Sequence, residues 1–123
     1  MDAGDLQRWV VEYERAWRAP GTDALADLFA ADATYSMHPF AEPVAGLAAI
    51  RRLWDEERPP GERFTMESRV VAFDDGVGVV WLEVHYTAPR DQLFRDLWIV
   101  RLGDDGRCTA FEEWPFEPGH TVG

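Results

Sequence analysis

The chain has 123 residues with a formal net charge of −11, and 46% of its residues are hydrophobic, including six Trp and seven Phe. This composition is too apolar for a disordered chain, and the length predicts a single domain, 1–123, with a substantial core. Acidic residues and Arg are interleaved rather than gathered into a basic stripe, so phosphate backbones would be repelled and we expect no nucleic-acid partner.

Signals for export, membrane insertion and cofactor binding are absent from the sequence. The N-terminal stretch MDAGDLQRWVVEYERAW is acidic where a signal peptide is basic, and no apolar run could span a bilayer, so we expect a cytoplasmic protein with no membrane partner. A single cysteine, Cys108, excludes an internal disulfide and a cysteine-rich metal cluster. Without a phosphate-binding loop or dinucleotide fingerprint, we expect no cofactor and no metal. A facial triad of His38, His85 and one carboxylate is the remaining metal alternative.

Three helices are predicted in the first half of the chain. Thr22 can cap a short second helix in DALADLFA, 23–30, and the third, LAAIRRLWDEER, 47–58, ends at the following Pro-Pro-Gly. Between these two, TYSM at 34–37 predicts a brief strand. The first helix ends at Pro20, and its apolar face is marked by residues at three- and four-residue steps: Leu6, Trp9, Val10, Tyr13, Ala16 and Trp17.

From residue 62 the apolar period changes from helical to alternating. Strands are predicted at 63–73, 77–88, 92–102 and 107–116, separated by turns that contain DDG, PRD and GDDG. Because Asp-Gly pairs favour hairpins, the strands should form an antiparallel meander. The expected fold is α+β, a cone-shaped curved antiparallel sheet wrapped around three N-terminal helices, with a pocket at its open end. We expect 117–123 to be a loose tail.

Three sequence blocks carry a resemblance over residues 5–117. LFAADATY, then PF.EPVAG..AI..LW, and finally RLGDDGRC…EEW.F resemble the nuclear transport factor 2-like superfamily, and within it the SnoaL-like and ketosteroid-isomerase-like proteins. The resemblance implies the same cone. It also implies a range of functions: isomerases, dehydratases, hydrolases, polyketide cyclases and binding modules share the fold. Many relatives form dimers through the outer sheet face, so we expect a homodimer there, with Trp114 on that face.

The isomerases of the resembled family carry three site positions that can be matched to this chain. The tyrosine of the first helix falls on Tyr13. The aspartate that acts as the base in these isomerases corresponds to Met37 when the segment from Thr34 is aligned without gaps. It corresponds to His38 when the alignment is anchored at the following proline. The late acid falls on Trp98. Two of the three catalytic positions therefore depart from the isomerase pattern.

Two polar residues are candidates for acid–base chemistry in the first half of the chain. An imidazole titrates near neutrality, so His38 is a candidate to shuttle a proton; alternatively it bonds a backbone group at a strand end beside Pro39. Tyr13 could donate a hydrogen bond to a ligand carbonyl or enolate, or be only the polar end of a buried helix face.

A second group of candidates lies on the late strands. Asp96 and Glu113 could face the cavity together and share a proton, or pair with Arg101, Arg107 or Arg69 at the sheet edge. The strand at 77–88 could line the pocket with either of its faces. Further residues are expected to contact the ligand: Trp17, Met37, Phe40, Trp54, Trp98 and Phe111.

The predicted ligand is a small apolar or aromatic molecule in the conical pocket. One hypothesis is cofactor-free isomerisation, cyclisation or dehydration of a carbonyl compound, with Tyr13 polarising the carbonyl and His38 moving the proton. The alternative is a non-catalytic ligand-binding or dimerisation module. A third hypothesis is polyester or epoxide hydrolysis, with water activated by Asp96 or Glu113.

Overall fold

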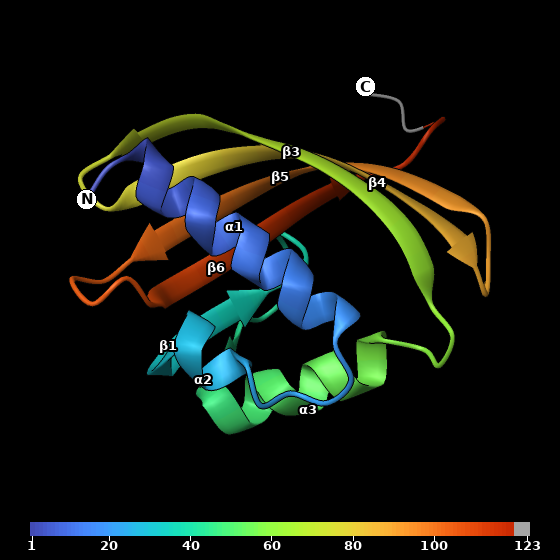
Figure 1. Cartoon of the computed structure of the whole chain (residues 1–123), viewed down its shortest axis with the longest axis horizontal. Coiled ribbons are helices and arrows are strands. Elements are labelled where there is room, and N and C mark those ends of the chain that lie inside the picture. Colours follow the sequence, from blue (N-terminus) through green and yellow to red (C-terminus); the bar gives the residue numbers. More distant parts are fainter. Residues whose placement is uncertain (120–123) are drawn as a thin grey trace.

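The computed structural model describes residues 1–119 and shows a curved six-stranded sheet around helix α1 (Figure 1). The strand order is β2-β1-β6-β5-β4-β3, and the helices cover the concave side of the sheet. The predicted α+β cone is confirmed. The elements in chain order are α1 Ala3–Arg18, α2 Leu25–Leu28, β1 Phe29–Ser36, β2 Val44–Ala45, α3 Leu47–Glu57, β3 Arg63–Asp74, β4 Val77–Ala88, β5 Gln92–Leu102 and β6 Cys108–Phe116.

Helix α1 starts at a capping box. The backbone N–H of Asp5 donates to Asp2 Oδ1 at 3.1 Å, and the Asp2 N–H donates to Asp5 Oδ2 at 2.7 Å, so two N–H groups of the first turn are satisfied. The helix ends before Pro20, as predicted. Its buried face is the predicted one: Leu6, Trp9, Val10, Tyr13 and Ala16.

The region after α1 differs from the sequence prediction. Helix α2 has only four residues and starts after Ala24 without a side-chain cap, so the expected cap at Thr22 is wrong. Strand β1 begins at Phe29, five residues before the predicted start, because Phe29 already pairs with Cys108 of the parallel strand β6. The sheet pairing overrides the local helical pattern here. The two-residue strand β2, which pairs with the end of β1, was not predicted.

Strands β3 to β6 form the predicted antiparallel meander. The β3–β4 hairpin turns at Asp75 and Gly76, which have φ of 50° and 78°, a conformation that favours glycine and tolerates aspartate. Strand β4 turns its Val80, Leu82 and Val84 inward, which decides the orientation that the sequence left open. Of the predicted tail, 117–119 is exposed and 120–123 lies outside the described residues.

Arg58 connects the end of α3 to the end of α1 by hydrogen bonds. Its guanidinium donates to the carbonyls of Ala19 at 2.9 Å and Gly21 at 2.7 Å. These bonds satisfy carbonyl groups just beyond α1 and hold the two helices together at one end of the cone. Among the described residues, no helix has the length and apolar character needed to cross a membrane.

Candidate functional site

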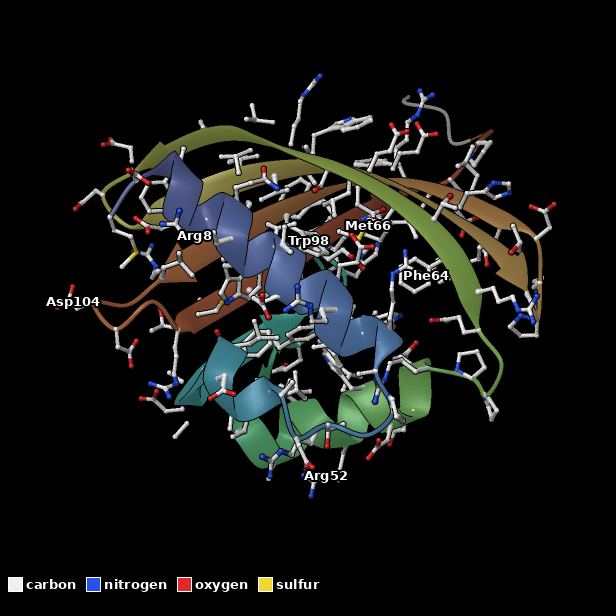
Figure 2. The ribbon with its side chains drawn as sticks, in the orientation of Figure 1. Arg8, Arg52, Phe64, Met66, Trp98 and Asp104 are labelled. Atoms are coloured by element: carbon white, nitrogen blue, oxygen red, sulfur yellow. The ribbon has the colours of Figure 1, made fainter. Side chains whose placement is uncertain are left out.

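A cavity of about 560 Å³ opens at the end of the cone where α1 and α3 end. It lies between the C-terminal half of α1, the end of α3 and the concave side of strands β3 to β6. Figure 2 shows Phe64, Met66 and Trp98 on this side of the sheet. Alternation along β3 and β4 brings their apolar side chains into the wall. The main apolar and aromatic lining residues are Tyr13, Trp17, Met37, Phe64, Met66, Val84, Tyr86, Phe94 and Trp98.

Two carboxylic acids lie in the wall of the cavity on neighbouring strands. Asp96 of β5 pairs in register with Pro115, and Trp98 pairs with Glu113 of β6, so the two acids are diagonal neighbours on one face. The Trp98 Nε1–H donates to Glu113 Oε2 at 2.8 Å. Asp96 is only 5% exposed, and its Oδ1 is buried with no hydrogen-bond partner among the described residues.

The environment of the acid pair favours the protonated form. Burial, together with the neighbouring Glu113 carboxylate, raises the pKa of Asp96 to about 8. Burial also raises the pKa of Glu113, and the hydrogen bond from Trp98 opposes this rise. Because two like charges are unfavourable in a buried site, the pair retains a proton at neutral pH.

The alternative pairing of these acids with arginine at the sheet edge is wrong. Arg107 forms an ion pair with Asp105 at 3.2 Å, and the Arg69 guanidinium lies 5.0 Å from the ring centre of Trp81, a residue on the face of β4 opposite the cavity. Among the residues that the structure describes, no ion pair involves Asp96 or Glu113. Their charge is therefore not compensated within the chain.

Tyr13 brings a hydroxyl group to the same cavity. Its hydroxyl is hydrogen-bonded to that of Tyr35, and its ring centre is 4.5 Å from that of Trp98. Burial raises the pKa of both tyrosines well above their ordinary value, with a contribution from the Glu113 charge. Both hydroxyls are therefore neutral and can donate a proton to a hydrogen bond. Since either can be the donor in the Tyr13–Tyr35 bond, donation by Tyr35 leaves the Tyr13 proton free for a ligand.

His38 and Phe40 lie outside the cavity, contrary to the sequence expectation. His38 is exposed, and its Nδ1 accepts a hydrogen bond from the Phe40 N–H at 3.2 Å, while Phe40 is 94% exposed. Strand β1 ends at Ser36, and from this segment only Met37 reaches the cavity wall. The geometry thus corresponds to the ungapped match, with Met37 at the position where the resembled isomerases carry their base.

Trp54 and Phe111 are core residues behind the wall. They are 1% and 2% exposed, and their ring centres lie 5.1 Å and 5.5 Å from that of Tyr13. They fix the position of the Tyr13 ring and do not line the cavity. Trp17 does line it, and its Nε1–H donates to Glu62 at 2.7 Å.

Several residues that line the cavity were not predicted from the sequence. Phe64 and Met66 are alternate apolar positions of the strand predicted at 63–73, so the sequence pattern placed them on one face but did not show that this face lines a cavity. Glu57 and Glu62 flank the Pro-Pro-Gly turn after α3, and no local pattern indicates that this turn faces a cavity. The complete additional set is Glu14, Glu57, Pro59, Glu62, Phe64, Met66, Val84, Tyr86, Ala88, Pro89, Arg90, Gln92, Phe94 and Pro115.

The metal alternative finds no assembled site in the described part of the chain. No group of three or more His, Cys, Asp or Glu residues has the arrangement of a metal site there. His38 is in the exposed loop after β1, and His85 Nε2 instead lies 2.8 Å from Asp91 Oδ1. The triad of His38, His85 and a carboxylate is therefore not formed.

Comparison with known proteins places the chain by both sequence and fold. The family model of the SnoaL-like domain matches residues 10–111. A provisionally assigned isomerase from Rhodopseudomonas palustris has a TM-score of 0.72 and 17% identity, over 89% of this chain and 90% of its own. An NTF-2-like protein of unknown function from Burkholderia xenovorans LB400 has a TM-score of 0.70 and 15% identity, over 98% and 89%.

A third solved structure gives the same result. It is a provisionally assigned isomerase of the SnoaL-like family from Agrobacterium tumefaciens str. C58, with a TM-score of 0.71 and 16% identity, over 92% of this chain and 98% of that one. At these identities the likeness concerns the fold alone. No curated protein matches the sequence. Because the family model spans most of the chain, this protein belongs to the family of SnoaL-like domains.

Proposed function

We propose that the cavity binds an apolar carbonyl compound and catalyses a cofactor-free proton shift at the carbon next to the carbonyl group. The observation that carries the proposal is the pair of buried Asp96 and half-buried Glu113 in an aromatic cavity, beside a tyrosine that can donate a hydrogen bond. A pair that retains one proton near neutral pH holds a base and an acid side by side.

The acid pair supplies the proton transfers. The ionised member removes a proton from the α-carbon: the C–H bond breaks, an O–H bond forms on the carboxyl group, and the electron pair moves to the carbonyl oxygen. Return of a proton to another position of the enolate gives the isomer and restores the pair. A positioned acid–base group of this kind contributes about 10²- to 10⁴-fold in rate.

Tyr13 stabilises the negative charge that develops on the oxygen. Its neutral hydroxyl lies in the cavity wall and donates to the carbonyl or enolate oxygen. The hydrogen bond to the Tyr35 hydroxyl keeps it in this position. The rings of Trp54 and Phe111 restrict the motion of Tyr13, so the donor is oriented before the substrate binds. His38 has no role in this scheme, because it is exposed and outside the cavity.

The names of two similar structures support isomerisation as the reaction class, since both proteins are provisionally assigned as isomerases. The main alternative is a module that binds the same ligand without chemistry. Both functions require the same ligand-binding cavity, and only the enzyme also transfers a proton.

Deuterium exchange distinguishes them without knowledge of the natural substrate. Phenylacetone and 4-phenyl-2-butanone are incubated with the protein in D₂O, and loss of the α-proton signals is followed by NMR. We expect exchange above the buffer rate, and a decrease of about 10²- to 10⁴-fold in Asp96→Asn. The matched control is Glu67→Gln, which removes one carboxylate from an exposed position of β3 on the face opposite Met66.

Binding is measured in the same samples from chemical shifts of the labelled protein. A ketone that binds but shows no exchange above buffer refutes the enzymatic proposal and establishes the binding alternative. Equal exchange rates in the wild-type protein and Asp96→Asn would also refute the role of the acid pair.

A further inference from the structure

The charged groups around the cavity are strongly unbalanced. Among the described lining residues there are five carboxylates and one guanidinium, that of Arg90. The carboxylates come from three of the surrounding segments, α1, the end of α3 with its following turn, and the late strands: Glu14, Glu57, Glu62, Asp96 and Glu113.

Only part of this negative charge is compensated by the chain itself. Glu14 forms an ion pair with Arg18 at 2.9 Å, and Glu62 accepts the indole hydrogen bond of Trp17 and lies near the Arg58 charge. Asp96 and Glu113 have no cationic partner among the described residues; Asp96 shares a proton with Glu113 and accepts from the Phe116 backbone N–H, and its buried Oδ1 has no other donor there. A buried acid pair with no cation in the chain is unfavourable once both groups are ionised, so it indicates a cationic donor supplied by a ligand.

The other walls of the cavity suit a cation with an apolar body. Tyr13, Trp98, Tyr86 and Phe94 line the cavity together with the acid pair. Aromatic faces attract cations, and a wall residue already does so: the Arg18 guanidinium carbon lies 3.9 Å from the ring centre of Phe64. The same rings also bury apolar surface of a ligand.

We propose that the ligand of this cavity is a protonated amine with an apolar or aromatic body, whose ammonium group donates to Asp96 Oδ1 beside Glu113. The inference rests on the binding part of the proposed function and narrows its substrate class to carbonyl compounds that also carry an amine. An ammonium group at the pair displaces the shared proton, so both carboxylates are ionised when the ligand is bound and one is available as a base.

The proton displacement predicts a pH dependence of affinity. The titratable and charged groups that line the cavity with Asp96 are Glu113 on β6, Tyr86 on β4, Tyr13 and Glu14 on α1, Glu57 and Glu62 at the end of α3 and in the following turn, and Arg90 in the β4–β5 turn. Apart from Arg90 these are neutral or negative. Lower pH keeps the proton on the pair, which then competes with the ammonium group, so the amine should bind more tightly as pH rises from 6 to 8.

Three probes of similar shape and different charge test this inference: 2-phenylethylamine, 2-phenylethanol and phenylacetate. Dissociation constants are obtained at pH 7.5 by chemical-shift titration of the labelled protein. We expect the amine to bind at least tenfold more tightly than the alcohol, and phenylacetate to bind most weakly. Amine affinity should also fall several-fold at pH 6, while the affinity for the alcohol stays within about twofold.

Variants separate the specific contact from the overall negative charge. Asp96→Asn should weaken amine binding about tenfold and change alcohol binding less than twofold, and Glu113→Gln provides a second variant if the first does not fold. Glu67→Gln, on the opposite sheet face, should leave both affinities unchanged.

The outcomes keep this inference distinct from the proposed reaction. If the alcohol binds as tightly as the amine, or if none of the three probes binds, the amine inference is refuted. If that occurs while the wild-type protein still exchanges ketone protons, the proposed reaction stands. If the protein binds the amine selectively but does not exchange the α-protons of the ketones, the amine site is supported and the proposed reaction is refuted.

Discussion

Replacing Asp96 by Asn should stabilise the fold near neutral pH. The buried carboxyl group has a pKa of about 8 in the folded protein, against an ordinary value of 3.8. Between these values the unfolded chain releases the Asp96 proton while the folded chain retains it, so stability falls as pH rises from about 4 to about 8. Asn stays neutral in both states and removes this loss. Its amide can also donate to Glu113.

The size of the effect follows from the two pKa values. A pH of 7 is about three units above the ordinary pKa of the Asp96 carboxyl group in the unfolded chain. At about 1.4 kcal/mol per unit, this difference corresponds to about 4 kcal/mol of lost stability. Burying the amide of Asn costs about 1–2 kcal/mol if one N–H finds no acceptor. The expected net gain in the free energy of unfolding is therefore about 2–3 kcal/mol at pH 7, and close to zero at pH 4.5.

Urea unfolding followed by tryptophan fluorescence measures the effect at five pH values from 4.5 to 8.5. The wild-type protein should lose stability with pH more steeply than Asp96→Asn. Glu67→Gln removes the same formal charge from an exposed site and should follow the wild-type curve, which separates the buried group from the repulsion due to net charge. Parallel curves for the wild-type protein and Asp96→Asn, or a variant less stable at pH 7, would show that Asp96 is ionised in the folded protein and would refute the shared proton.

Three further predictions concern other parts of the molecule. Tyr13→Phe and Tyr35→Phe should each lower the free energy of unfolding by about 1–2 kcal/mol, because one buried hydroxyl loses its partner, but only Tyr13→Phe should also slow ketone exchange by tenfold or more; equal exchange rates would contradict the donor role. His38→Gln should change exchange less than twofold and stability by less than about 0.5 kcal/mol, since the side chain is exposed; a large loss of exchange would return His38 to the site. We expect a homodimer through the outer sheet face, where Leu97 and Trp114 are paired in register and each 37% exposed; wild-type protein that sediments as a monomer at micromolar concentration, or an unchanged dimer in Trp114→Glu, would contradict this.

Local patterns in the sequence determined most of the elements of the fold. The apolar steps from Leu6 to Trp17 fixed the buried face of α1, and the alternation after residue 62 with its Asp-Gly turns fixed the meander, because helical and strand periods place side chains on faces without reference to distant residues. The same alternation placed Asp96 on the sheet face of Trp98, and the family resemblance placed Glu113 on the cavity side. These residues do line the cavity.

The tertiary structure decided what depends on distant segments. Strand β1 starts at Phe29 rather than Thr34 because β6, some eighty residues later, pairs with it in parallel, and no local pattern encodes that pairing. Likewise, a gap of one residue in the match decided between Met37 and His38, and only the direction in which the chain leaves β1 placed Met37 in the wall and His38 in solvent. The protonation of Asp96 is also a tertiary property: the sequence supplies a carboxyl group, but burial beside Glu113 without a cationic partner sets its pKa.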